Sequence, residues 1–240
     1  MVKYRQISEI IRKRIMNKEY SADEPIPNEI SLAEEFGCSR MTIKKALDEL
    51  VMRGLLYRKR GHGTFIVKSA VDNDLINVTV DESVGLTNLL KLQGKKVTSK
   101  ILKFEVKFPD KEVADQLSID SKTPVYEIMR LRYVEGEPYV IEHTYMPASL
   151  ITGINEEVLH SSIYRHITET LKLTMGGSFR KVRACKPNEW DIKYLECAPD
   201  DPVLEVEQIG YLNTGVPFEY SFSRHRYDKF VFTSVNIRRN

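Results

Sequence analysis

The sequence predicts an α+β protein in which a small helical module precedes a mainly antiparallel β-sheet domain with helices. Three observations predict it. Apolar residues recur every three or four positions in the N-terminal part, as one face of a helix requires. Short β-prone runs separated by glycine turns follow. The net charge also differs between the two parts, since the first is basic and the second is acidic. We therefore expect a first domain at residues 1–69, a linker at 70–77 and a second domain at 78–240.

The net charge of the 240 residues is only +2, which by itself argues against a nucleic-acid partner. Divided near the linker, the charge is +5 over residues 1–70 and −3 over the remaining 170. A basic module joined to an acidic one is typical of a protein with an anionic partner at one end and another task at the other, although a basic domain can also simply be soluble.

The composition excludes several classes of protein. No stretch reaches the ~18 consecutive apolar residues of a membrane span and no signal peptide is present, so we expect a cytoplasmic protein without a membrane partner. Three cysteines, and five histidines without metal-ligand spacing, predict neither disulfides nor a metal site. Without a glycine-rich phosphate loop or a nucleophile elbow, no catalytic residue and no cofactor are predicted.

The first domain is predicted to begin with an amphipathic helix. Arg12 falls outside its apolar stripe, which contains Tyr4, Ile7, Ile10, Ile11 and Ile15. After a loop with two prolines, Asn28 can cap a short second helix that ends at Gly37.

A third helix follows after a three-residue turn. Ser39 is its natural N-cap and Gly54 its end, and its buried stripe contains Ile43, Ala46, Leu47 and Leu50. This is the spacing of a helix-turn-helix. Two β-prone runs around Gly61-His62-Gly63 then predict a hairpin.

The start of the third helix presents polar side chains away from its apolar stripe. The major groove of DNA admits one helix, where Arg can bond guanine and Ser, Thr or Lys can bond phosphates or bases. We therefore predict DNA contacts by Ser39, Arg40, Thr42 and Lys44. The hairpin tip Gly61-His62-Gly63 lacks bulk and follows three basic residues, so we expect it along the phosphate backbone or in the minor groove. The alternative is that these charges form a solvated face.

These motifs resemble a known family. Residues 3–67 resemble the winged helix-turn-helix of GntR-type bacterial transcription regulators through Ile26-Pro27-Asn28-Glu29, Leu32-Ala33-Glu34-Glu35-Phe36-Gly37, Ser39-Arg40-Met41-Thr42-Ile43 and Gly61-His62-Gly63-Thr64-Phe65. The resemblance implies that Ser39, Arg40 and Thr42 contact operator DNA and that the wing glycines reach the minor groove. Ile30 replaces the family's usual basic residue and Lys44 its commoner Arg, which implies a different base preference.

An internal repeat with an offset of 78 residues organises the second domain. It matches Lys107-Phe108-Pro109-Asp110 with Cys185-Lys186-Pro187-Asn188, Leu117 with Leu195, Pro124-Val125 with Pro202-Val203, and Tyr133 with Tyr211. Each copy is interpreted as strand, short helix, strand, glycine turn and return strand, which predicts an antiparallel sheet with helices on one face. Trp190, which replaces Glu112 in the second copy, is interpreted as a core residue.

Two arginines in one strand are candidate ligand-binding residues. Arg130 and Arg132 are two residues apart and so project from the same sheet face, where they repel unless an anion or carboxylates lie between them. Glu142 and Glu219 each follow a hairpin proline by an even number of residues and are expected to share a face. The arginines either form structural ion pairs or bind an anionic group while the glutamates accept hydrogen bonds from hydroxyls, as a phosphorylated sugar demands.

A second resemblance covers roughly residues 75–238. Arg130-Leu131-Arg132, Gly136-Glu137-Pro138, Tyr145-Met146-Pro147, Phe218-Glu219-Tyr220 and Arg226-Tyr227-Asp228 resemble the UTRA effector domain of the HutC subfamily, whose fold is similar to chorismate lyase. The resemblance implies that a phosphate is held by Thr87, Arg130, Arg132 and Ser162, and a sugar by Glu142 and Glu219. His225 stands where an aromatic residue is frequent. It either bonds a ligand hydroxyl or is an ordinary surface histidine.

Together these features predict a ligand-responsive transcription regulator, a repressor of a carbohydrate or amino-sugar operon released by a phosphorylated sugar. A homodimer formed through the second domains is expected to bind near-palindromic double-stranded operator DNA. The alternatives are a non-sugar effector such as urocanate, a phosphonate or another small carboxylate, and a DNA-binding module whose second domain only dimerises. A lyase-like enzyme tethered to DNA is the remaining rival.

Overall fold

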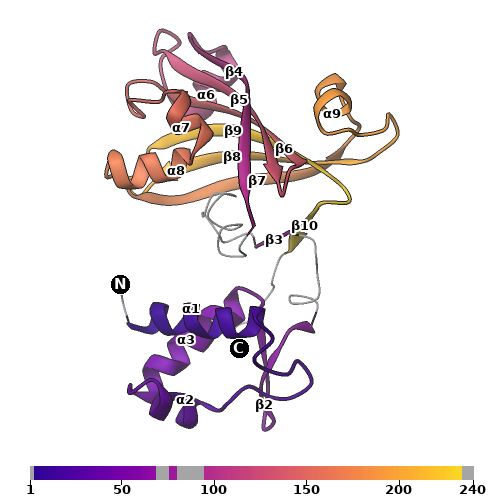
Figure 1. Ribbon diagram of the computed structural model, residues 1–240. Helices are drawn as coiled ribbons and strands as arrows, with labels where there is room; N and C mark the ends of the chain where they lie inside the picture. Colours follow the sequence, from indigo (N-terminus) through magenta and orange to yellow (C-terminus); the bar gives the residue numbers. More distant parts are fainter. Residues whose placement is uncertain (1–2, 69–75, 80–94, 234–240) are drawn as a thin grey trace. The chain divides into compact units, whose positions relative to one another are not determined.

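The computed structural model describes residues 3–68, 76–79 and 95–233 (Figure 1). The chain divides into two units, the first containing Met1–Asp81 and Val231–Asn240 and the second Glu82–Phe230. The first unit contains the helical module and a two-stranded sheet of β3 (Ile76–Thr79) with β10 (Phe230–Thr233), whose first residue belongs to the second unit.

The three expected helices are present, as α1 (Lys3–Met16), α2 (Glu29–Glu35) and α3 (Arg40–Met52). They share one core with the hairpin, which includes Ile7, Ile11, Leu32 and Leu47. Two assignments in α1 were wrong. Ile10 is 43% exposed, and Arg12 is buried, with its Nε donating to Glu9 Oε2 at 3.0 Å. A carboxylate one turn away lets a guanidinium lie at the edge of the core.

Both predicted caps are formed. Asn28 Oδ1 accepts hydrogen bonds from the backbone N–H groups of Ile30 and Ser31, each at 3.0 Å, and Ser39 Oγ accepts from that of Thr42 at 3.2 Å. The caps satisfy amide groups that the first turn of a helix leaves open. They fix the points at which α2 and α3 begin, and thereby which residues α3 presents at its start. The wing follows as the antiparallel strands β1 (Leu56–Lys59) and β2 (Gly63–Ile66).

The second unit is built on a six-stranded antiparallel sheet with the order β4-β5-β6-β9-β8-β7. The strands are β4 (Val97–Lys107), β5 (Val125–Val134), β6 (Glu137–Pro147), β7 (Met175–Cys185), β8 (Val203–Leu212) and β9 (Pro217–Arg226). The repeat is visible in these bounds, because β7 and β8 lie 78 residues after β4 and β5 at both ends. The two copies meet where β6 pairs with β9, so the strand order of one copy mirrors that of the other.

Helices cover both faces of this sheet, not one. The repeat supplies α6 (Lys111–Leu117) and α9 (Glu189–Tyr194), whose Leu117 and following Leu195 pack on the same face. We call this the α6–α9 face. The segment between the copies forms α7 (Glu156–His160), α8 (Ile163–Arg165) and a π-helical turn (His166–Thr170) on the opposite face, the α7–α8 face. There Leu159 and Ile163 pack in one core with Ile128 and Met146 of the sheet.

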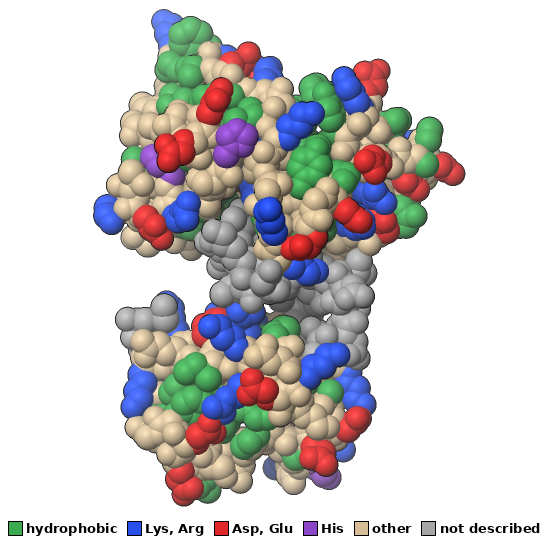
Figure 2. All heavy atoms as spheres, viewed as in Figure 1, with side chains coloured by type: hydrophobic (Ala, Val, Ile, Leu, Met, Phe, Trp, Pro, Cys, Tyr) green, Lys and Arg blue, Asp and Glu red, His purple; other side chains and the backbone are tan. Residues whose placement is uncertain are grey.

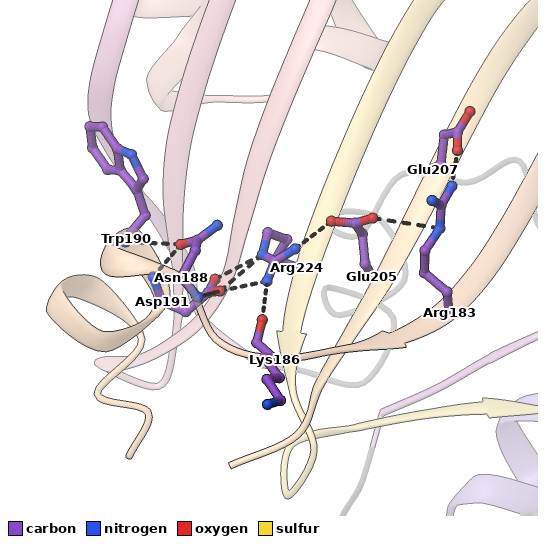
Figure 3. A network of polar contacts seen from close by, with 8 residues as sticks. All are labelled: Arg183, Lys186, Asn188, Trp190, Asp191, Glu205, Glu207 and Arg224. Atoms are coloured by element: carbon purple, nitrogen blue, oxygen red, sulfur yellow. Dashed lines mark hydrogen bonds and ion pairs between the residues drawn. The ribbon is translucent and has the colours of Figure 1, made fainter. Parts of the chain in front are cut away.

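An ionic network holds α9 against the sheet (Figure 3). Asp191 is fully buried, and its Oδ2 accepts from Arg224 Nη2 at 2.7 Å and from the backbone N–H of Asn188 at 2.8 Å. Arg224 also contacts Glu205 on β8 and the carbonyl of Lys186. Because these polar contacts anchor the helix, Trp190 is 41% exposed and stacks on Tyr194, so its assignment to the core was wrong.

Candidate DNA interface and effector site

The polar residues at the start of α3 lie on its accessible side. Ser39, Arg40 and Lys44 are exposed and Thr42 is half-buried. The hydroxyls of Ser39 and Thr42 are 2.9 Å apart. The Arg40 side chain is 68% exposed, and its Nε donates to Glu29 Oε2 on α2 at 3.2 Å. All four residues predicted at this helix start are therefore at least partly accessible.

The wing tip is also accessible. Gly61, His62 and Gly63 are exposed, and His62 Nδ1 lies 3.0 Å from the carbonyl oxygen of Arg60. Gly63 adopts a φ of +115°, and a Cβ atom there would lie 3.0 Å from Pro25 Cβ. Glycine is therefore required for both its backbone conformation and its close approach to the loop before α2.

Acidic side chains accompany the basic ones in this unit. Figure 2 shows Asp and Glu interspersed with Lys and Arg on the face in view of the N-terminal unit, at the bottom of the picture. Arg58 of β1 is one such case, since its Nη1 donates to Asp48 Oδ1 at 2.5 Å. The excess of positive charge is therefore partly compensated by local ion pairs.

In the second unit, Arg130 and Arg132 project together from β5, as the spacing predicted. Both are buried, with exposed fractions of 6% and 3%. Arg130 Nη2 donates to Glu142 Oε2 at 2.7 Å, and Arg132 Nη1 lies 3.5 Å from the same oxygen. Arg130 Nη1 donates to the carbonyl of Leu159 in α7 at 2.9 Å. The pair therefore faces α7, with one carboxylate oxygen bridging it.

The two arginines keep Glu142 ionised despite its burial. Burial acts to raise the pKa of Glu142, but the positive charges of Arg130 and Arg132 outweigh it and hold that pKa below its usual value. Burial lowers the pKa of Arg132. The group thus combines one ionised carboxylate with two guanidiniums.

Glu219 shares this sheet face, which confirms the inference from the hairpin prolines. Its carboxylate is buried and accepts hydrogen bonds from Tyr164 Oη at 2.6 Å, Ser221 Oγ at 2.6 Å and Gln208 Nε2 at 3.2 Å. Burial raises the pKa of Glu219. Sequence reasoning missed the roles of Tyr164, Gln208 and Ser221. Only Ser221 carried a signal, since it lies two residues after Glu219 in a strand.

Ser162 and His225 are the remaining predicted ligand-binding residues within the described part of the chain. Ser162 is buried and caps α8, with its Oγ accepting from the backbone N–H of Arg165 at 3.2 Å. His225 is 5% exposed and stacks on Phe230 with a centroid separation of 3.8 Å. The alternative of a surface histidine was therefore wrong. Burial lowers the pKa of His225 to about 3, so the ring is neutral near pH 7. Thr87 lies outside the described residues.

Within residues 3–68, 76–79 and 95–233, no group of three or more His, Cys, Asp or Glu side chains is arranged to hold a metal ion. In the same part of the chain, no helix combines the length and the apolar character needed to cross a membrane.

A capped helix-turn-helix with a wing, joined to a sheet domain that buries an arginine pair, defines a ligand-responsive DNA-binding transcription regulator. Comparison with protein families agrees. The model for bacterial regulatory proteins of the gntR family matches residues 3–66, and the UTRA domain model matches residues 92–231. The chain belongs to the gntR family of bacterial regulatory proteins, among the members that carry a UTRA domain.

Relatives of known name match over all or nearly all of their length. The chain is 62% identical over 239 residues to the HTH-type transcriptional regulator GmuR of Bacillus subtilis, with 100% of both chains covered. It is 31% identical to the mannosyl-D-glycerate transport/metabolism system repressor MngR of Escherichia coli, covering 99% of this chain and 97% of that one. The crystal structure of the possible transcriptional regulator YydK from Bacillus subtilis superposes with a TM-score of 0.79 at 29% identity, with 100% of both chains covered.

Proposed function

We propose that this regulator represses a carbohydrate-utilisation operon and releases its operator when a phosphorylated sugar binds the second domain. The observation that carries the proposal is the buried pair Arg130 and Arg132, which shares one oxygen of Glu142. Two buried guanidiniums carry two positive charges against the one negative charge of Glu142, and a phosphate can accept hydrogen bonds from both with good geometry. The relative MngR is named as the repressor of a mannosyl-D-glycerate system, which favours a sugar-derived effector.

The roles within the site follow from its chemistry. Arg130, Arg132 and Ser162, with Thr87, take the phosphate, while Glu142 and Glu219 accept hydrogen bonds from sugar hydroxyls. His225 is neutral and buried on the same sheet face, so its ring can bond a further hydroxyl. Part of the contact between Arg130 and Glu142 is then exchanged for contacts to the ligand, which couples binding to a rearrangement around α7.

On the DNA side, we assign base and phosphate contacts to Ser39, Arg40, Thr42 and Lys44, and minor-groove or backbone contacts to Gly61, His62 and Gly63. A homodimer formed through the second domains presents two such surfaces to the half-sites of a near-palindromic operator in the cytoplasm. The regulator binds its effector without turning it over. Effector and operator affect each other's affinity through the difference between two states, and ~1–3 kcal/mol of coupling gives ~5–150-fold.

Thermal melting of the full chain against a panel of phosphorylated sugars, urocanate and phosphonates tests the effector class. We expect a sugar phosphate to raise the melting temperature and the unphosphorylated sugar to have little effect, because the arginine pair needs an anion. Stabilisation by urocanate or a phosphonate alone would name a non-sugar effector. No stabilisation by any compound would favour a second domain that only dimerises, and conversion of a bound compound would identify an enzyme. Light scattering during size-exclusion chromatography measures the oligomeric state.

A further inference from the structure

Glu29 joins three elements of the N-terminal unit. It is the first residue of α2, and its carboxylate contacts two arginines from other elements. Oε2 accepts from Arg40 Nε at the start of α3 at 3.2 Å, and Oε1 lies 3.8 Å from Arg58 Nη2 on strand β1 of the wing. The Glu29 side chain is only 26% exposed, whereas that of Arg40 is 68% exposed. The acid is thus less exposed than either of the two cations that it contacts.

This arrangement does little for stability, because exposed ion pairs of this kind contribute ~0–1 kcal/mol at most. Its consequence lies in which atoms it leaves for DNA. Glu29 engages Arg40 through Nε, on the side edge of the guanidinium, which leaves the end edge formed by the two terminal amino groups to bond one guanine. The planar guanidinium is held at one edge and is thereby oriented.

Arg58 is restrained differently. It contacts Glu29 and also Asp48, whose Oδ1 accepts from Nη1 at 2.5 Å. A cation held by two carboxylates gains less from a DNA phosphate, because each phosphate contact must replace an existing one. Since phosphate contacts provide the affinity for DNA of any sequence, this restraint weakens sequence-independent binding.

We propose that Glu29 is a positioning and specificity-determining residue of the DNA-binding surface. It orients Arg40 for base recognition, and it restrains Arg58 so that less positive charge is available to the phosphate backbone. The inference rests on the proposed contact between Arg40 and DNA and adds to it a reason for an acidic residue at the interface.

The test compares Glu29→Gln with Glu35→Gln in the full chain. Gln keeps the size of the side chain and removes one negative charge in both cases. Glu35 is on the same helix but pairs with Arg14 at 2.5 Å, away from the predicted contacts. The dissociation constant is measured over a range of salt concentrations for two duplexes. One is selected from a random library by the wild-type protein, and the other is a shuffled duplex of the same composition.

For Glu29→Gln we expect about three- to tenfold tighter binding to the shuffled duplex, with a salt dependence steeper by about one unit of slope. Binding to the selected duplex stays equal or weakens, so discrimination falls about tenfold. Glu35→Gln should change the discrimination less than twofold. Equal effects of the two variants, or an unchanged discrimination in Glu29→Gln, would overturn the proposal.

Arg40→Ala, measured in parallel, separates this inference from the proposed interface. If Arg40→Ala retains full discrimination between the two duplexes, the assignment of the start of α3 as the recognition surface is wrong. If Arg40→Ala loses discrimination but Glu29→Gln does not, only the role of Glu29 fails. Circular dichroism confirms folding. Should Glu29→Gln melt too early to measure, Glu29→Asp keeps the negative charge at the start of α2 but is too short to reach both arginines, and the same loss of discrimination is expected.

Discussion

Arg130 and Glu142 lie directly opposite each other on β5 and β6 and are joined by a hydrogen bond of 2.7 Å between Nη2 and Oε2. Strand pairing fixes this opposition, and the helices on the α7–α8 face bury it. The pair is therefore a structural ion pair, and it lies at the position where we propose that a ligand anion binds.

Glu142→Gln tests both the structural role and the proposed ligand-binding role of this position. The change removes the carboxylate charge that Arg130 and Arg132 share, so we expect the free energy of unfolding to fall by ~3–5 kcal/mol. Inorganic phosphate should restore more stability in the variant than in the wild type, because the variant lacks the competing carboxylate. Urea unfolding with and without phosphate measures both effects. A variant that loses stability but responds to phosphate no more than the wild type would show that Glu142 does not occupy an anion site.

His225 makes the second domain sensitive to acid. Its pKa in the folded chain is about 3, below its usual 6.5. As the pH falls below 6.5, His225 takes up a proton in the unfolded chain but stays neutral in the folded chain. The free energy of unfolding therefore falls progressively toward pH 3, by up to ~1.4 kcal/mol per pH unit. The stabilisation from Glu142 runs in the same direction but is lost only at lower pH, through its depressed pKa.

His225→Phe separates the two groups. The variant keeps an aromatic ring against Phe230 and removes the titration. Between about pH 6 and 5, above the usual pKa of 4.5 for Glu142, its stability should depend on pH less steeply than that of the wild type by ~1 kcal/mol per unit. Parallel slopes in this range, measured by denaturant unfolding, would contradict the burial of a neutral His225.

The ion pair between Asp191 and Arg224 anchors α9 where the first copy of the repeat uses Val113. Asp191→Ala should lower the free energy of unfolding by ~3 kcal/mol, because it removes a fully buried carboxylate and leaves the half-buried Arg224 with Glu205 as its remaining carboxylate partner. Glu137→Gln, which breaks an exposed pair with Lys229, is the matched control and should cause no measurable loss. Equal effects of the two substitutions would show that α9 is held by its apolar contacts alone.

Gly63→Ala should weaken DNA binding through the wing. Alanine must adopt a φ of +115° and bring its Cβ to 3.0 Å from Pro25, which costs ~1–3 kcal/mol and distorts the hairpin. We expect about a tenfold loss in affinity for a selected duplex. Gly61→Ala, at a φ of +76° with open space around the new methyl group, should lose less. The reverse order in a titration would exclude the contact with Pro25 as the cause.

Local sequence patterns were sufficient to predict much of the fold. The caps Asn28 and Ser39 and the buried stripe of α3 depend on neighbours within one turn of helix, so the sequence alone predicts them. The repeat with an offset of 78 residues predicted the strands, because matching residues in the two copies form the same strands and turns. The shared face of Arg130 and Arg132 followed from the two-residue period of a strand.

The remaining features depend on partners far apart in the chain. His225 is buried because Phe230 stacks on it, and Trp190 is exposed because Asp191 takes the inward position on α9. The contacts of Glu219 with Tyr164 and of Glu29 with Arg40 join separate elements. The sequence determined the family, the two modules and most of the charged candidates. Tertiary structure alone decided which of those charges meet, because a side chain's environment depends on segments that local periodicity does not bring together.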